Sequence, residues 1–180
     1  LQEVFLDKEL AGVTGSSHWY DMPFSPHNHW VEDLFKNQLF RHEKNFPFLF
    51  GTNMAIRKTD WDLIKADLCT DKYLFEDADI AIHLFQANKK LLYDIRLRAG
   101  MSARRGSDSL KDFRRYINLQ TVTYKKHGIK TVGSSISIVA YMLGFIILRP
   151  LYLSYDPALQ KRTFKHLFFR KIQARPHPFE

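Results

Sequence analysis

Cysteine is almost absent from this sequence. Among its 180 residues the one cysteine is Cys69, which cannot form an internal disulfide and has no companion cysteines to complete a zinc site. We expect Cys69 to be a small buried apolar residue in a protein of the reducing cytoplasm. The opening segment LQEVFLDKEL is charged and lacks the positive stretch and apolar run of a signal peptide. It also lacks an initial Met, so we expect a portion of the protein to lie upstream.

Acidic side chains are scarce in the last quarter of the chain. The whole sequence has 27 Lys and Arg against 19 Asp and Glu, for a net charge of +8. Residues 131–180 contribute +5 of this charge, because their seven basic residues face only Asp156 and Glu180. A basic tail beside an apolar segment indicates binding to anionic lipid headgroups. A nucleic-acid-binding protein would more often carry its basic residues on one face of the folded domain. Membrane lipids are therefore an expected partner, and nucleic acid is not.

Residues 132–148, VGSSISIVAYMLGFIIL, contain no charged side chain. This length is at the lower limit for crossing a bilayer, and Arg149 and Pro150 then interrupt the run. We predict a membrane-spanning or interfacial segment at residues 131–155, with a buried core helix as the alternative. Basic residues lie on both sides of it, so the positive-inside rule does not orient a single crossing. A basic tail at residues 156–180 completes the chain.

The remaining sequence alternates strand-like and helix-like patterns, and its composition, 45% hydrophobic and 14% aromatic, is sufficient for one packed core. The fold class predicted from this alternation is α/β. In chain order the patterns predict a short strand at 11–17 that ends in a glycine turn, a helix at 29–43 and strand pieces on both sides of Gly51. They further predict a helix capped by Thr59, a helix at 76–90 with Phe85 on its apolar face, a strand at 91–103, and an amphipathic helix at 107–130 capped by Ser107 or Ser109.

Two motifs suggest the chemistry. Gly51 opens the sequence GTNMAIR, and Glu76 opens EDADI, where three carboxylates stand at the start of a predicted helix. With VTG before them and SARR after them, these motifs resemble the C-terminal half of the family 2 glycosyltransferases, which have the GT-A fold. The resemblance covers residues 8–130. It implies that residues 1–106 are the C-terminal half of a GT-A catalytic domain.

The resemblance implies an inverting, hexosyl-type transferase that works in polysaccharide biosynthesis at the cell envelope. Asp77 would be the catalytic base that takes the proton from the acceptor hydroxyl, and Glu76 would orient it or bind the acceptor. Two arginines would face the leaving diphosphate, since a guanidinium pairs with phosphate oxygens. The substrate-binding residues implied in this way are Gly51, Thr52, Asn53, Asp79, Arg104 and Arg105.

All of these residues except Thr52 also have a structural interpretation. The carboxylates at positions 76, 77 and 79 can simply favour the helix dipole, and Asn53 can cap local backbone. Gly51 can be an ordinary turn glycine, and the two arginines can form a solvated surface pair. Crowding of carboxylates raises a pKa while a helix N-terminus lowers it, so the sign of the shift at Asp77 stays open.

The resemblance also implies a set of ligands. The donor would be a nucleoside diphosphate sugar and the acceptor a glycan or a lipid-linked molecule. A Mg or Mn ion would neutralise the leaving diphosphate, with its ligands outside this chain. Neither the family's Asp-x-Asp metal motif nor its first nucleotide-binding strand is recognisable, so we expect this segment by itself to be inactive. No metal site is expected within the chain, because His27 and His29 lack a third ligand.

Two rival functions follow from the same sequence. The first is a non-catalytic, membrane-associated interaction module derived from a transferase half-domain. The second is a basic nucleic-acid-binding protein, whose binding would collapse with added salt. We favour the transferase, with its catalytic part on the cytoplasmic side of the cell membrane.

Overall fold

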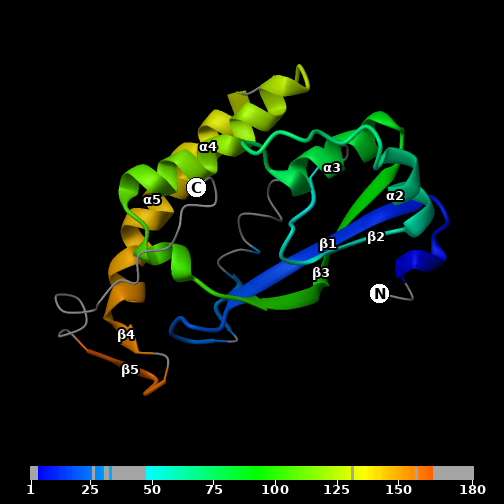
Figure 1. Ribbon diagram of the computed structural model, residues 1–180. Helices are drawn as coiled ribbons and strands as arrows, with labels where there is room; N and C mark the ends of the chain where they lie inside the picture. The colour runs from blue at the N-terminus through cyan, green and yellow to red at the C-terminus, as the bar shows by residue number, and fades with distance from the viewer. Residues whose placement is uncertain are drawn as a thin grey trace. The chain divides into compact units, whose positions relative to one another are not determined.

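The protein is described by a computed structural model, which places residues 4–25, 27–30, 33, 48–130, 132–156 and 158–163. These residues form a mixed α/β structure, which confirms the predicted fold class at this level (Figure 1). The chain divides into two compact units. The first unit comprises residues 1–18 and 29–100, and the second unit comprises residues 19–28 and 101–180.

The first unit is built around strand β1 (Leu10–Trp19), the middle strand of a three-stranded mixed sheet of order β2-β1-β3 (Figure 1). Every residue from Leu10 to Ser17 is buried, so both faces of the strand are covered. A strand in this position needs apolar or small side chains on both faces, and the sequence LAGVTGSS supplies them. The predicted strand at 11–17 is confirmed, but it does not end in a glycine turn, because β1 continues through Gly15 to Trp19.

Two strands flank β1. Strand β2 (Met54–Ile56) pairs with it in antiparallel fashion, with Gly12 opposite Ile56, and strand β3 (Lys90–Met101) lies on its other side. The strand predicted at 91–103 is therefore confirmed. Of the two strand pieces predicted around Gly51, only the second forms. The first does not form, because the chain enters a turn at Phe50. The N–H of Phe50 donates to the side-chain hydroxyl of Thr14 in β1.

Helices α2 (Lys58–Ile64) and α3 (Glu76–Gln86) pack on the sheet through one apolar core. Ile80 and Leu84 of α3 are buried there, and burial of such side chains contributes about 1.5–3 kcal/mol each. The helix predicted at 76–90 forms but ends at Gln86, and Phe85 is 41% exposed and does not belong to its apolar face. The core residues are Ala11, Leu49, Ile64, Ile80, Ala81 and Leu84.

The start of α2 differs from the prediction that Thr59 caps it. The helix begins at Lys58, and Arg57 is its N-cap residue. The carbonyl oxygen of Arg57 accepts the N–H groups of Asp60 (3.0 Å) and Trp61 (2.9 Å). The Arg57 side chain donates to the carbonyl oxygen of Leu10 (3.1 Å), so the residue is fixed as the junction between β2 and α2. Tertiary hydrogen bonds thus set this boundary, rather than the side-chain cap that local sequence favours.

In the second unit, helix α4 (Leu110–Lys126) packs against helix α5 (Val132–Ser154) (Figure 1). The Ser109 hydroxyl caps α4 by accepting the N–H of Asp112 (3.1 Å). Gly128 follows the helix with φ +68°, a conformation that glycine adopts without strain. The rings of Phe113 and Phe145 stack with centroids 4.1 Å apart and join the two helices. The amphipathic helix is confirmed, with the second of its two predicted caps.

Helix α5 contains the long charge-free run. Among the described residues, no helix has both the length and the apolar character needed to cross a membrane. The spanning alternative for residues 131–155 is therefore not found in the part of the chain that the structure describes. The interfacial alternative stays a prediction. Exposed apolar side chains of α5 include Ile136, Val139, Leu143, Ile146 and Ile147.

Two predicted features fall largely outside the described residues. Of the helix expected at 29–43, the structure places only His29, Trp30 and Asp33. Of the basic tail expected at 156–180, it places Asp156 and residues 158–163, which include the short strand β5 (Lys161–Arg162). This strand pairs with β4 (Tyr155–Asp156).

We expect Gly15→Ala to destabilise the first unit strongly. A Cβ at Gly15 would overlap the carbonyl oxygen of Leu97 in β3 and would lie 2.6 Å from the Leu97 Cβ, so the two strands would have to separate. The expected loss in the free energy of unfolding is about 3 kcal/mol. Chemical denaturation followed by circular dichroism measures it.

Gly144→Ala in α5 is the matched control. A Cβ there meets no described atom within 4 Å, and alanine is favoured over glycine inside a helix by about 1 kcal/mol. This variant should be at least as stable as the unmodified chain. Equal stability of the Gly15 and Gly144 variants would contradict the close approach of β1 to β3.

Candidate active site at the start of helix α3

The turn at residues 50–53 is tied to the centre of the sheet. Thr14 of β1 is fully buried, and its Oγ1 donates to the carbonyl oxygen of Asn53 (2.8 Å) while accepting the N–H of Phe50 (2.9 Å). The N–H of Gly15 donates to the same Asn53 oxygen (3.1 Å). A hydroxyl can donate and accept at once, which suits Thr14 to this position. Three hydrogen bonds from a buried strand therefore fix the place of Gly51.

Asn53 supports the turn with its side chain as well. Its Nδ2 donates to the carbonyl oxygens of Ser16 in β1 (2.8 Å) and Leu97 in β3 (2.9 Å). Both amide hydrogens are thereby bonded to the main chain, which also assigns the orientation of the amide. The Asn53 side chain therefore bonds main-chain oxygens that are 37 and 44 residues away, and it does not cap local backbone. The residue positions the turn, and its role toward a substrate hydroxyl stays a prediction.

Asp77 is the second residue of α3, and its carboxylate faces the turn. Oδ2 accepts the N–H of Gly51 (2.9 Å), and Oδ1 accepts the N–H of Ala78 (2.8 Å). A Cβ on Gly51 would lie 3.3 Å from Oδ2, closer than most such contacts, so a larger residue would push the carboxylate away. The structure thus brings together Gly51 and Asp77, which belong to the two separate motifs of the sequence.

Burial raises the pKa of the Asp77 carboxyl above its ordinary value of 3.8. The hydrogen bonds from Gly51 and Ala78 lower the pKa, and the negative charge of Glu76 raises it further. Desolvation is the largest of these effects, so the net direction is upward. The sign that the sequence left open is therefore decided by the packing around α3. A carboxylate with a raised pKa is a stronger base.

The other two carboxylates of the motif have different surroundings. Glu76 is exposed and lines a pocket of about 270 Å³ in the first unit. Asp79 is only 3% exposed, and its Oδ2 accepts the backbone N–H of Cys69 (2.9 Å). Asp79 therefore holds the segment that precedes α3, and its predicted contact with substrate stays untested. Asp77, in contrast, accepts a hydrogen bond from the Gly51 turn.

Cys69, Asp79 and His83 form a cluster that the sequence did not predict. Each offers one atom able to bind a metal, and these atoms lie within 4.8 Å of one another. The Oδ1 of Asp79 is 3.8 Å from the Nε2 of His83, since residues four apart lie on one face of a helix. The Asp-x-x-x-His spacing was the available signal. Cys69 carries no comparable signal, because it lies in an irregular segment outside the helix.

The remaining predicted residues are Thr52, Arg104 and Arg105. Thr52 is exposed beside Gly51 in the first unit. Both arginines belong to the second unit, in the short helix η2 (Arg104–Ser107). The Arg105 guanidinium lies 3.3 Å from the centroid of the Tyr116 ring and 3.4 Å from the carboxylate of Asp108, whereas Arg104 is exposed. These contacts account for the position of Arg105 without a ligand, and the diphosphate role stays a prediction.

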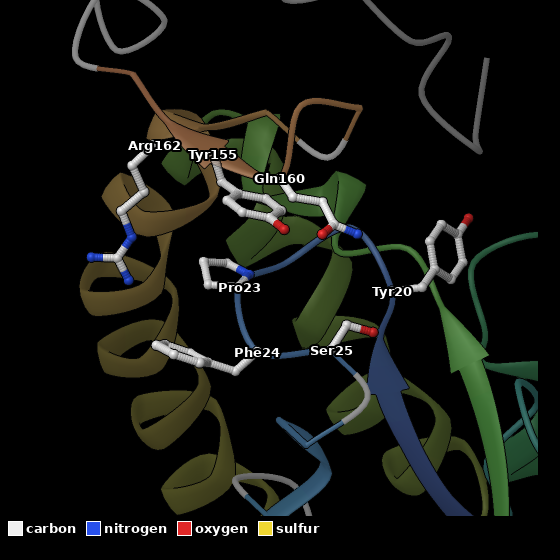
Figure 2. Close-up of a pocket in the computed structure, with 7 residues that line it drawn as sticks. All are labelled: Tyr20, Pro23, Phe24, Ser25, Tyr155, Gln160 and Arg162. Carbon is white, nitrogen blue, oxygen red and sulfur yellow. The ribbon is translucent and has the colours of Figure 1, made fainter.

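The second unit contains a pocket of about 530 Å³. In Figure 2 the ring of Tyr155 lies next to Pro23 and Gln160 at this pocket. Phe24 and Gln160 have φ values of 62° and 50°, which are uncommon for residues other than glycine and are often found at binding sites. Sequence reasoning missed this pocket because its walls come from segments far apart in the chain. They are Tyr20, Pro23, Phe24, Ser25, Tyr155, Gln160 and Arg162.

Comparison with known proteins adds no family to this description. No protein-family model matches the chain, and a search of curated proteins found no match. Function is therefore inferred from the geometry of Asp77 and its neighbours, together with the resemblance of the motifs.

The carboxyl pKa values of Asp77 and Asp62 are expected to differ in opposite directions from 3.8. Asp62 is exposed and bonded to Lys58 and Lys65, which lowers its pKa to about 2, whereas burial raises that of Asp77. NMR titration of the side-chain carboxyl carbons measures both in one sample. A raised folded-state pKa means that protonated Asp77 favours folding below pH 3.8, and that this contribution is lost as the pH rises through the raised value.

Asp62 serves as the internal reference of this titration, since both carboxylates belong to the first unit. A titration of Asp77 at or below 3.8 would contradict the dominance of desolvation over its two hydrogen bonds.

Proposed function

We propose that this chain carries the acceptor side of an inverting glycosyltransferase with a GT-A domain, and that Asp77 is its catalytic base. The observation that supports this most directly is the state of the Asp77 carboxylate. It is fixed by two backbone N–H groups and partly buried, and its pKa is raised. A general base works best when it is held in place and its pKa approaches the working pH.

In the proposed reaction, Asp77 takes the proton of the acceptor hydroxyl as the acceptor oxygen forms a bond to the anomeric carbon. The bond between that carbon and the diphosphate oxygen breaks, and the nucleoside diphosphate leaves with the electron pair. Attack opposite the leaving group inverts the anomeric configuration. The hydrogen bonds from Gly51 and Ala78 orient the carboxylate for the transfer, and burial strengthens its basicity.

The neighbouring residues take supporting roles in this proposal. Glu76 is exposed beside the base and would bind the acceptor through its carboxylate. Thr52 is exposed next to Gly51 and would contact the same substrate, while Asn53 acts by holding the turn. Arg104 is exposed in the second unit, and its pairing with a diphosphate stays a prediction from the resemblance alone.

The divalent ion implied by the resemblance would be held outside this chain. The cluster of Cys69, Asp79 and His83 does not fit Mg²⁺, which prefers a shell made wholly of oxygen ligands. The chemistry of a Mg or Mn ion at the diphosphate would be to stabilise the negative charge of the leaving group. No step of the proposed proton transfer at Asp77 passes through it.

The surface of helix α5 supports a location at the membrane. Ile136, Val139, Leu143, Ile146 and Ile147 are all more than half exposed. Apolar side chains on an exposed helix with basic neighbours favour adsorption to the headgroup region of anionic bilayers. We propose that this helix contacts the cytoplasmic surface of the cell membrane, where a lipid-linked or growing glycan acceptor would be found.

Asp77→Asn is expected to reduce sugar transfer by about 10²–10⁴-fold, because an amide cannot accept the hydroxyl proton. The assay uses membranes that contain the complete reading frame around this chain. Transfer from a panel of nucleoside diphosphate sugars to the membrane fraction is measured, together with donor binding and the amount of membrane-bound protein.

Asp62→Asn is the matched control, since it makes the same chemical change at an exposed carboxylate of α2. Its transfer rate should stay within about twofold of the unmodified protein, as is usual for a surface substitution. Unchanged transfer in the Asp77 variant would remove this residue from the mechanism. Absence of transfer with every donor would favour the non-catalytic membrane module.

Ile146→Gln with Ile147→Gln is expected to weaken binding to anionic vesicles. Both side chains are exposed on α5, at 53% and 67%, so the change leaves the packing of the helix intact. Loss of two apolar contacts should lower the partition coefficient at least about tenfold, since a buried aliphatic side chain contributes about 1.5–3 kcal/mol. Cosedimentation with phosphatidylserine-containing vesicles measures it.

Leu159→Gln provides the comparison, because Leu159 is similarly exposed, at 64%, but lies outside α5. Equal loss in both variants, or no vesicle binding by the unmodified chain, would contradict a specific role of α5 at the membrane.

A further inference from the structure

Three different metal-binding side chains converge in the first unit. Cys69 precedes α3, and Asp79 and His83 lie one turn apart on it. Their possible ligand atoms are a thiol sulfur, a carboxylate oxygen and a ring nitrogen, all within 4.8 Å of one another. The cluster differs from the Asp77 site in position and in chemistry, and none of its members takes the proton in the proposed transfer.

We propose that Cys69, Asp79 and His83 form a binding site for Zn²⁺. The remaining coordination positions are left to water or to a further side chain. The proposal concerns metal binding by this chain, and it stands whether or not Asp77 is a catalytic base.

The donor types decide which metal the site favours. Thiolate, imidazole and carboxylate are the three ligand classes that Zn²⁺ takes in proteins, while Mg²⁺ and Ca²⁺ avoid sulfur. Around tetrahedral Zn²⁺, with bonds of about 2.0–2.3 Å, ligand atoms are roughly 3.3–3.8 Å apart. The separation of 3.8 Å between Asp79 Oδ1 and His83 Nε2 is near this range, and a limit of 4.8 Å for the whole set requires only small side-chain rotations.

The surroundings already organise two of the ligands. Asp79 accepts the backbone N–H of Cys69 through Oδ2 (2.9 Å), which fixes the cysteine segment against α3 and leaves Oδ1 on the side of His83. Hydrogen bonds of this kind orient carboxylate ligands in metal sites. Asp79 is 3% exposed, so a charged carboxylate there is stabilised by a bound cation.

Two of the three proposed ligands line a pocket. The pocket of about 270 Å³ in the first unit is lined by Cys69 and Asp79, together with Asp71 and Glu76. Acidic side chains at its wall raise the local concentration of cations. Zinc bound by Cys69, Asp79 and His83 would fasten the segment around Cys69 to helix α3, the helix that also carries Asp77.

The test uses the untagged 180-residue chain, stripped with a chelator and dialysed against Zn²⁺ or Co²⁺. We expect one ion to bind, and the Co²⁺ form to show a thiolate-to-cobalt charge-transfer band with intense tetrahedral bands. Cys69→Ser should abolish the charge-transfer band and raise the Kd for Zn²⁺ by more than about 100-fold. Replacing even a residue that only hydrogen-bonds to a metal ligand typically changes metal affinity about 10–100-fold. His83→Gln should raise the Kd similarly and keep the charge-transfer band.

His27→Gln is the matched control, because His27 is exposed and outside the cluster, in the other candidate histidine pair of the sequence. Its Zn²⁺ affinity should equal that of the unmodified chain. Circular dichroism establishes that each variant is folded. If Cys69→Ser does not fold, the alkylation rate of Cys69 is measured instead in the unmodified chain, with and without Zn²⁺. Bound Zn²⁺ should slow this alkylation.

Several results would overturn the proposal. They are a chain that binds no Zn²⁺ at concentrations well above those of the protein, a Co²⁺ spectrum without a thiolate band, a Cys69 alkylation rate that Zn²⁺ does not change, or an affinity lost in His27→Gln and kept in Cys69→Ser. If the chain binds Zn²⁺ but no sugar transfer is measured with any nucleoside diphosphate sugar, the zinc proposal stands and the proposed function is rejected.

Discussion

The hydrogen bonds between buried strand β1 and the turn at residues 50–53 are the constraint on which the candidate site depends. Thr14 has no exposed surface, so its hydroxyl must find protein partners, and it finds both in the backbone of the turn. Asn53 adds a bridge across β1 and β3. A glycine at position 51 then allows the Asp77 carboxylate to approach the backbone. Sheet, turn and helix start are therefore one connected polar arrangement.

The same arrangement explains how a carboxylate at a helix N-terminus can be a strong base. The helix dipole and two N–H donors stabilise the charged form of Asp77, and burial destabilises it. Because desolvation is the larger effect, the hydrogen bonds fix the geometry without making the carboxylate a weak base. An exposed carboxylate such as Asp62, paired with Lys58 and Lys65, shows the opposite balance.

Helix α3 separates two chemistries by its own periodicity. Asp77 bonds to the Gly51 turn, whereas Asp79 and His83 face the segment around Cys69. Residues two apart point in different directions on a helix, and residues four apart share a face. One run of acidic residues can thus supply a base at one place and metal ligands at another. A resemblance of motifs can assign the catalytic base at Asp77, which lies within the acidic motif. It cannot assign the metal ligands as readily, because Cys69 lies outside the helix.

The sequence by itself determined the helices α3 and α4 and the mixed α/β class, because a helical period is set by residues close together in the chain. It indicated strand β1 from a run of small and apolar residues. It placed the acidic motif at a helix start, and the resemblance pointed to Asp77. Only the tertiary structure decided that α2 begins after Arg57 and that the chain turns at Phe50. It also decided the direction of the Asp77 pKa shift and brought Cys69 close to Asp79 and His83. These features depend on contacts between segments far apart in the chain, and on burial, which no local pattern of residues encodes.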